Sequence, residues 1–346
     1  MDKTNLLARV HTEGNPLIDD ETVTFIWDGN SAPHLIDDLH GWEEHPKRLK
    51  RLAPDLWAVS FNLPLDAYLE YSFYEPETKT RLKDPFNKHR IYNGVGGYNN
   101  FFYMPKAAPS PLTKLGTGVK PGTVTRYEVG TWMLGLESKR AIHLYRPAAK
   151  HEPLPLLIVY DGTDYLRRGK LTVIADNLIA QKRIRPIAIA MLQNGGQDRR
   201  FIEYACSDGT LSWIRHDVLP LAQKKLKLTD ERGAFGVLGA SMGGLMAMYT
   251  GLRLPETFGK VISQAGVFWF EGMPTSAVEL IENKPCPDMK IWMDAGYMDF
   301  LLEDNRRIQP ILRERGYNVT YREAGGAHNY TSWRNNLGDA LETMFG

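Results

Sequence analysis

The sequence predicts two domains: a small all-β domain, followed by an α/β domain with a mostly parallel sheet flanked by helices. Three observations support this prediction. The chain has 346 residues, more than one hydrophobic core usually organises. Short β-branched and aromatic segments separated by turns dominate its first part. Beyond them, apolar segments alternate with helix-forming ones, the pattern of a helix-covered sheet.

The first domain is expected over residues 1–106. Strand signals occur in four segments, at residues 23–27, 56–61, 68–74 and 99–104. The turn 84–87 interrupts this series, and no segment has a convincing helical period. We therefore expect a β-sandwich of the immunoglobulin type. Residues 107–122 are rich in Pro, Gly, Ser, Thr and Lys and are predicted to be a linker.

The second domain is expected over residues 123–346. Its predicted strands cover residues 123–129, 140–145, 156–160, 187–192, 235–239, 261–264, 291–295 and 319–323. Its predicted helices cover residues 171–180, 213–226, 245–253, 301–315 and 332–344. Several strands are apolar along their whole length, as in Leu156-Leu157-Ile158-Val159, which requires burial on both faces of the sheet.

Composition excludes several kinds of partner. The formal net charge is +1, and the chain has no Lys/Arg run of the length that such partners need, so we expect binding to neither nucleic acid nor an anionic membrane. Cys206 and Cys286 are too few for a disulfide framework and lack metal-ligand spacing. The polar N-terminus and the absence of a membrane-length apolar stretch predict a cytoplasmic protein. No heptad or apolar stripe predicts an oligomeric state.

Residues 239–243, Gly-Ala-Ser-Met-Gly, form a G-x-S-x-G motif. A strand-like segment precedes it and a helix-forming segment follows, which is the context in which such a serine occupies a strained turn. We therefore predict Ser241 to be a nucleophile, with the Met242 amide at the helix N-terminus as an oxyanion donor. A simple glycine-rich turn is the alternative.

A serine nucleophile needs a base, and His328 is the one histidine that follows Ser241 in the sequence. It follows a predicted strand and the glycine-containing loop 324–327. We expect His328 to be the base, with the order serine, acid, histidine along the chain.

The acid is expected to be Asp299, on the loop after the strand 291–295. Asp294 is still within that strand, and Glu303 and Asp304 fall in the first turn of the next helix, where the helix dipole explains a carboxylate. A role for Asp299 as a helix N-cap is the alternative.

A second oxyanion donor is expected after the strand 156–160, from the amide of Gly162 or Thr163. A glycine here would let the backbone approach the substrate; an ordinary Asp-Gly turn is the alternative. The chain lacks a dinucleotide fingerprint, a P-loop and an H-E-x-x-H motif. We expect transfer of an acyl group to water through an acyl-enzyme, with neither cofactor nor metal.

Stretches along the whole chain are similar to those of one known family. They are residues 23–27, Trp57 and 84–87, then 140–147, 160–162, 200–204, 219–220 and 239–244, and finally 325–328 with Trp333. With them, the chain resembles the enterochelin (enterobactin, or siderophore) esterase family, within the esterase D-like group of α/β-hydrolases. The sharp turn at residues 239–243 (the elbow) and the loop that carries His328 (the histidine loop) are shared by the α/β-hydrolase superfamily. The order of the two domains points to the enterochelin esterase family.

The resemblance implies a serine carboxylic-ester hydrolase with Ser241 and His328 as catalytic residues and Asp299 at the acid position. It implies a small-molecule substrate, a cyclic or linear catecholate ester of serine that often carries iron. Relatives with the same hydrolase domain cleave feruloyl, acetyl or thioester substrates, so a feruloyl, acetyl or general carboxylesterase is the alternative. An acceptor other than water, a sugar or an alcohol, also stays open.

The expected substrate-binding residues are Arg200 and Trp333. Arg200 and Glu203 also stand at helical spacing, which favours a structural ion pair. An iron-loaded catecholate is anionic, and the sequence offers few basic residues for it, namely Arg199, Arg200, Arg306 and Arg307.

The first domain also resembles glycan-binding modules of starch-branching enzymes. Trp27, Trp42 and Trp57 would then form a sugar platform, and the protein would be non-catalytic and glycan-binding. Core tryptophans are more frequent than platforms, so we favour a packing domain whose loops, around residues 89–98, limit access to the active site.

Overall fold

The computed structural model describes residues 3–94, 96–149 and 153–346. The chain divides into two compact units. The first unit takes up the chain as far as Ala108 and adds two short segments from far along the sequence, Gly296–Phe300 and Ala324–His328. The second unit comprises Pro109–Ala295, Leu301–Glu323 and Asn329–Gly346.

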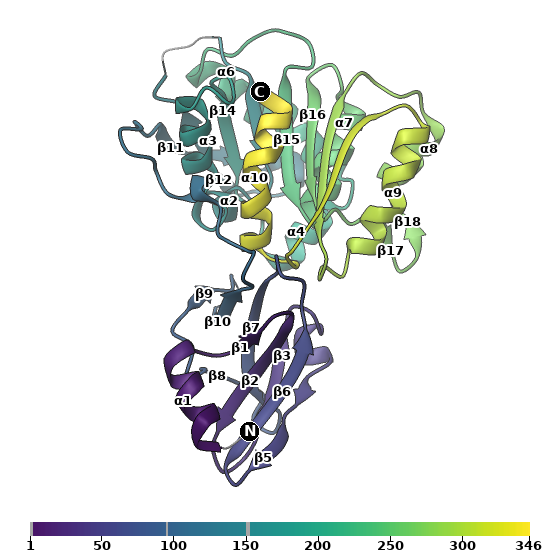
Figure 1. Cartoon of the computed structure of the whole chain (residues 1–346). Coiled ribbons are helices and arrows are strands. Elements are labelled where there is room, and N and C mark those ends of the chain that lie inside the picture. Colours follow the sequence, from purple (N-terminus) through teal and green to yellow (C-terminus); the bar gives the residue numbers. More distant parts are fainter. Residues whose placement is uncertain (1–2, 95, 150–152) are drawn as a thin grey trace. The chain divides into compact units, whose positions relative to one another are not determined.

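Two antiparallel sheets form the first unit (Figure 1). Its strands are β1 (Leu17–Asp19), β2 (Thr22–Asp28), β3 (His34–Asp37), β4 (Lys47–Arg48), β5 (Lys50–Ala53), β6 (Leu56–Asn62), β7 (Tyr68–Glu75), β8 (Thr80–Leu82), β9 (Arg90–Tyr92) and β10 (Tyr98–Tyr103). One sheet has the order β1-β2-β6-β5; the other has the order β4-β3-β7-β10-β9, with β8 beside β7. The four predicted strands are confirmed, each end within one residue.

Aromatic side chains from both sheets fill the core of this unit. Phe25 of β2 packs edge-on against Tyr71 of β7, with ring centroids 4.7 Å apart, and contacts Phe102 of β10 at 5.9 Å. Trp27 and Trp57 lie at the margin of the same core, opposite each other on β2 and β6. Their indole N–H groups donate to backbone carbonyl groups at 3.1 and 2.9 Å. Both half-buried tryptophans are thus held by packing and by these hydrogen bonds, while the choice between a packing domain and a sugar platform stays a prediction.

Helix α1 (Lys3–Glu13) corrects the expectation that this region lacks a helix. Leu6 and Val10, four residues apart, are buried against Ile26 and Leu56 of the sheet. This spacing is helical, but the segment is short and contains Asn, Thr and His, which are weak helix formers. Packing against the sheet therefore stabilises a helix that local propensity does not predict.

The second unit is an α/β domain built on eight strands. They are β11 (Thr123–Gly130), β12 (Lys139–Arg146), β13 (Leu156–Val159), β14 (Ala188–Leu192), β15 (Phe235–Ala240), β16 (Phe258–Gln264), β19 (Lys290–Gly296) and β20 (Asn318–Ala324). The sheet order is β11-β12-β14-β13-β15-β16-β19-β20. Strands β14, β13, β15, β16 and β19 run parallel, whereas β11 and β12 are antiparallel to their neighbours. The predicted, mostly parallel sheet is confirmed.

Helices cover both faces of this sheet. They are α2 (Gly162–Arg167), α3 (Leu171–Ala180), α4 (Gln197–Tyr204), α5 (Asp208–Trp213), α6 (Leu219–Lys225), α7 (Met242–Arg253), α8 (Ser276–Asn283), α9 (Leu302–Glu314) and α10 (Tyr330–Phe345). Leu157 and Val159 of β13 share a buried cluster with α3 and α10, which lie together in Figure 1. Leu156 and Ile158 share the other cluster, with α7, α8 and α9. The apolar strand is therefore buried on both faces, as its sequence requires.

One predicted helix differs in its form, and three further helices were not predicted. The helix predicted over residues 213–226 begins earlier, as α5, and passes through the π-helical turn Ile214–Val218 into α6. Helices α2, α4 and α8 have no counterpart in the prediction, since each is only one or two turns long. Within the described ranges, no helix combines the length and the apolar character that a membrane span requires.

Candidate active site

Ser241 occupies the sharp turn between β15 and α7. Its φ of 59° and ψ of −125° lie in a region that is costly for residues other than glycine. The Ser241 N–H donates to the Gln264 carbonyl at 2.9 Å, and the Ser241 carbonyl accepts from the Leu245 N–H at 3.1 Å. A Cβ at Gly239 would lie 2.1 Å from the Gly243 carbonyl oxygen, so the turn requires glycine there. This geometry confirms the predicted strained elbow.

Met242 is the first residue of α7. The first N–H groups of a helix have no partner within the helix, so the Met242 N–H can donate a hydrogen bond to an anionic oxygen. Its role as the first oxyanion donor stays a prediction.

A buried ion pair lies next to the elbow. Asp161 lies between β13 and α2. Its carboxylate is 1% exposed and accepts from Arg200 Nε at 2.8 Å and from Arg200 Nη2 at 2.7 Å. Asn194 donates to the same carboxylate at 2.6 Å. Arg200 Nη2 also approaches the Ala240 carbonyl, directly before Ser241, at 3.3 Å. Burial lowers the pKa of Arg200, but Asp161 more than offsets this and leaves it above its ordinary value.

These contacts correct the expected partner of Arg200. Glu203 does not pair with Arg200; its carboxylate binds Arg140 of β12 through two hydrogen bonds of 2.6 and 2.5 Å. Helical spacing makes Arg200 and Glu203 neighbours on α4. Each nevertheless pairs with an oppositely charged side chain from a strand or loop outside α4, and burial strengthens both ion pairs. The structure therefore gives Arg200 a structural role, and its predicted contact with substrate stays a prediction.

Arg200→Ala is expected to lower the free energy of unfolding by about 3 kcal/mol, because it leaves the buried Asp161 carboxylate without its cation. Urea denaturation measures the change. Arg306→Ala is the control, since Arg306 pairs with Glu303 and Glu323 at the exposed surface and is expected to change stability little. Equal, small effects of the two substitutions would contradict the structural role of Arg200.

Gly162 begins α2 directly after Asp161. A Cβ at Gly162 would lie 2.2 Å from the carbonyl carbon of Met191 and 2.3 Å from the Leu192 nitrogen. Glycine is therefore required here by the packing of α2 against β14, and the expected approach of this backbone to substrate stays a prediction. The Gly162 and Thr163 amides open this helix, and their role as the second oxyanion donor stays a prediction.

The structure brings Asp299 and His328 together. His328 Nδ1 lies 3.0 and 3.1 Å from the two carboxylate oxygens of Asp299. The Asp299 side chain is buried, while that of His328 is 21% exposed and contacts the Phe300 ring at a tilt of 42°, with centroids 4.4 Å apart. Leu301 is the N-cap residue of α9, two residues after Asp299. A buried carboxylate on Nδ1 orients the imidazole.

Asp294 is engaged elsewhere. It lies in β19, as expected, and its carboxylate accepts from Trp292 Nε1 at 2.6 Å and from Gln264 Nε2 at 3.0 Å. Gln264 in turn accepts from the Tyr165 hydroxyl at 2.9 Å. Asp294 therefore stabilises the sheet beside the elbow.

Trp333 lies near the start of α10. It is 6% exposed and belongs to the buried cluster under α10, where it contacts the Tyr330 ring at 4.9 Å. The predicted substrate contact of Trp333 stays a prediction. Its position next to the histidine loop in the sequence suggested the contact, but the period of α10 directs its side chain to the core.

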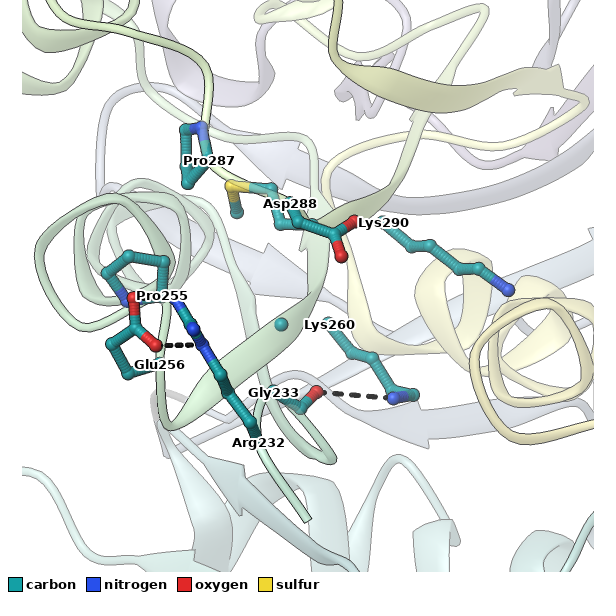
Figure 2. Close-up of a pocket in the computed structure, with 10 residues that line it drawn as sticks. Arg232, Gly233, Pro255, Glu256, Lys260, Pro287, Asp288 and Lys290 are labelled. Carbon is teal, nitrogen blue, oxygen red and sulfur yellow. Dashed lines mark hydrogen bonds and ion pairs between the residues drawn. The ribbon is translucent and has the colours of Figure 1, made fainter.

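A cavity of about 640 Å³ lies at the N-terminal ends of three sheet strands, opposite the end that carries Ser241 (Figure 2). Gly233 precedes β15, and Lys260 and Lys290 lie near the starts of β16 and β19, so the cavity is at the N-terminal ends of these strands. Arg232 pairs with Glu256, and Lys260 donates to the Gly233 carbonyl at 3.3 Å. Ser241 lies at the opposite, C-terminal end of β15, where active sites of such sheets form.

Comparisons with known proteins support an esterase. Residues 134–344 match the model of the family described as "Putative esterase". The chain is 24% identical over 397 residues to an iron(III) enterobactin esterase of Dickeya dadantii (strain 3937), covering 96% of this chain and 90% of that protein.

Two solved structures share the fold. A ferric enterobactin esterase of Salmonella typhimurium matches with a TM-score of 0.79 and 20% identity over 94% of both chains. An enterobactin esterase of Shigella flexneri, solved in the presence of 2,3-dihydroxy-N-benzoyl-serine, matches with a TM-score of 0.77 and 19% identity, over 99% of this chain and 98% of that one.

The match to this family identifies an ester-hydrolysing enzyme, built on the mostly parallel, helix-covered sheet. Since the family model spans more than half of the sequence, the chain belongs to this family of esterases. Within it, the chain is similar over nearly its whole length to the enterobactin esterases.

Proposed function

We propose that the protein is a serine carboxylesterase that hydrolyses catecholate esters of serine, of the kind found in siderophores. The observation that carries the proposal is the strained backbone of Ser241, a conformation kept at a cost between β15 and α7. Similarity to enterobactin esterases over both units supports the substrate class. The ligand of the Shigella flexneri relative is itself a dihydroxybenzoyl derivative of serine.

In the proposed mechanism, Ser241 Oγ attacks the ester carbonyl carbon and His328 Nε2 takes the serine proton. Asp299 holds Nδ1 and stabilises the imidazolium that forms. The amides of Met242 and of Gly162 or Thr163 receive the negative oxygen. The tetrahedral intermediate then expels the alkoxide of the serine ester, which takes the proton from His328. Water, activated by the same histidine, releases the acid from the acyl-enzyme.

The first unit completes the proposed organisation. We propose an immunoglobulin-like sandwich over residues 1–106, a linker over 107–122 and the catalytic domain over 123–346. The two antiparallel sheets with a shared aromatic core support the sandwich.

The charges of Arg200, Arg306 and Arg307 favour an iron-free substrate. Arg200 is bound to Asp161 and Arg306 to Glu303 and Glu323, so carboxylates already compensate these charges. Arg307 lies over the Trp269 ring, 4.0 Å from its centroid. A free catechol is uncharged at neutral pH, because phenols lose their proton near pH 10, whereas a ferric tris-catecholate is anionic. The neutral ester therefore needs no further cation.

The test is a substrate panel followed by chromatography. We expect the cyclic triester of dihydroxybenzoyl-serine to be converted to its linear forms and monomer, with a higher kcat/KM when iron-free than when ferric. Feruloyl esters and acetylated sugars are the comparison substrates. Efficient cleavage of these, with the catecholate esters left intact, would contradict the proposed substrate and support the feruloyl or acetyl alternative.

A further inference from the structure

The loops that carry Asp299 and His328 are part of the first unit. They follow β19 and β20 of the α/β sheet in sequence, yet Gly296–Phe300 and Ala324–His328 belong to the compact unit formed by the N-terminal strands. The acid and the base of the proposed triad are thus carried by segments whose packing partners lie in the first third of the chain.

A backbone contact fixes the histidine loop to β7. The Gly325 carbonyl accepts from the N–H of Tyr68, the first residue of β7, at 2.8 Å. A Cβ at Gly325 would lie 2.1 Å from the Asp66 carbonyl oxygen and 3.0 Å from the Ala67 Cα. Gly325 does not have a positive φ, so the close approach of two backbones, and not the conformation, requires glycine here.

Side chains next to both catalytic candidates enter the β core. Met298 directly precedes Asp299, and Ala327 directly precedes His328. They are 8% and 1% exposed and belong to the buried cluster that contains Leu69 of β7. Each catalytic candidate is therefore one residue from an anchor in the core of the first unit.

The two loops also hold each other. The Met298 N–H donates to the Gly326 carbonyl at 3.0 Å, and the Tyr297 N–H donates to the Ala324 carbonyl at 2.9 Å. A Cβ at Gly296 would lie 2.1 Å from the Gly326 oxygen. A displacement of either loop from the β core would therefore alter the 3.0 Å contact between Asp299 and His328.

We propose that the N-terminal β unit is a positioning element for catalysis: β7 and its core hold the acid and histidine loops, with Gly325 and Met298 as positioning residues. This inference rests on the proposed roles of Asp299 and His328.

Gly325→Ala tests the backbone contact. We expect kcat to fall by about 10- to 100-fold with KM nearly unchanged, because the added methyl group displaces the histidine loop from Asp66. We also expect the low-field proton resonance of His328 Nδ1–H to shift or broaden, since that proton lies on the contact with Asp299. Gly130→Ala is the matched control, because a Cβ there meets no atom within 4 Å and its φ is not positive.

Met298 provides a second test, which does not require the Gly325→Ala variant to fold. Met298→Ala leaves a void in the β core, whereas Met298→Leu keeps nearly the same apolar volume. We expect kcat to fall in the alanine variant and to recover in the leucine variant, with the His328 resonance following the same order.

Folded variants that keep the wild-type kcat and an unchanged His328 resonance would overturn the proposal. A lower melting temperature alone, with kcat unchanged, would show a merely structural contact and would overturn it too. If the wild-type protein hydrolyses no ester, the proposed function fails. The His328 resonance needs no substrate and still decides whether the β unit positions this pair.

Discussion

Ser241→Ala is expected to lower kcat for a short p-nitrophenyl ester by about 10⁶-fold, the scale on which loss of a serine nucleophile acts. The substitution removes only the Oγ atom and leaves the turn, the hydrogen bond to the Gln264 carbonyl and the start of α7 unchanged. The free energy of unfolding is therefore expected to stay at its wild-type value. Steady-state kinetics and urea denaturation measure the two effects.

The control for Ser241→Ala is Ser212→Ala, a partly buried serine on α5. It is expected to keep full activity. Reaction with a fluorophosphonate, followed by peptide mass analysis, should place the covalent adduct on Ser241 in the wild-type chain. Turnover retained by Ser241→Ala, or an adduct on another residue, would contradict its assignment as the nucleophile.

Asp299→Asn is expected to lower kcat by about 10⁴-fold while leaving KM nearly unchanged. The carboxylate lies on His328 Nδ1, so it fixes the tautomer with a proton at Nδ1 and stabilises the cation formed during reaction. An amide can present its NH₂ group to Nδ1 and favour the wrong tautomer. Pre-steady-state release of p-nitrophenol should show that acylation itself is slowed.

Asp294→Asn is the matched control for this prediction. Asp294 is also a buried aspartate and lies within β19. Its carboxylate accepts from Trp292 and Gln264 and does not contact His328 among the described hydrogen bonds. We expect a loss of about 1–3 kcal/mol in stability and a change in kcat of less than tenfold, as an order of magnitude. A larger loss of kcat in Asp294→Asn than in Asp299→Asn would reverse the assignment of the acid.

The elbow and its sheet were predictable because their signals are local. The strand before Ser241, the glycines around it and the helix after it are consecutive in the sequence, and their geometry depends on backbone sterics. Asp299 and His328 followed from chain order, since the strand sequence of this fold brings the loops after β19 and β20 to neighbouring positions.

Contacts between distant residues were not predictable in the same way. Arg200 binds Asp161, which is 39 residues away, although helical spacing pointed to Glu203. Helix α1 forms because Leu6 and Val10 find partners in the sheet, and local propensity carries no signal of those partners. The fit of Gly325 against Asp66 likewise depends on two backbones that are far apart in sequence.

The assignment of Gly296–Phe300 and Ala324–His328 to the first unit has a consequence for protein engineering. A fragment that starts at Pro109 would still encode Ser241, Asp299 and His328, but it would lack the buried surface on which two of these residues depend. The N-terminal part up to Ala108, expressed alone, would lack two segments of its own interior. Neither part is a transferable module, and a chimera would have to exchange three separate stretches of sequence together.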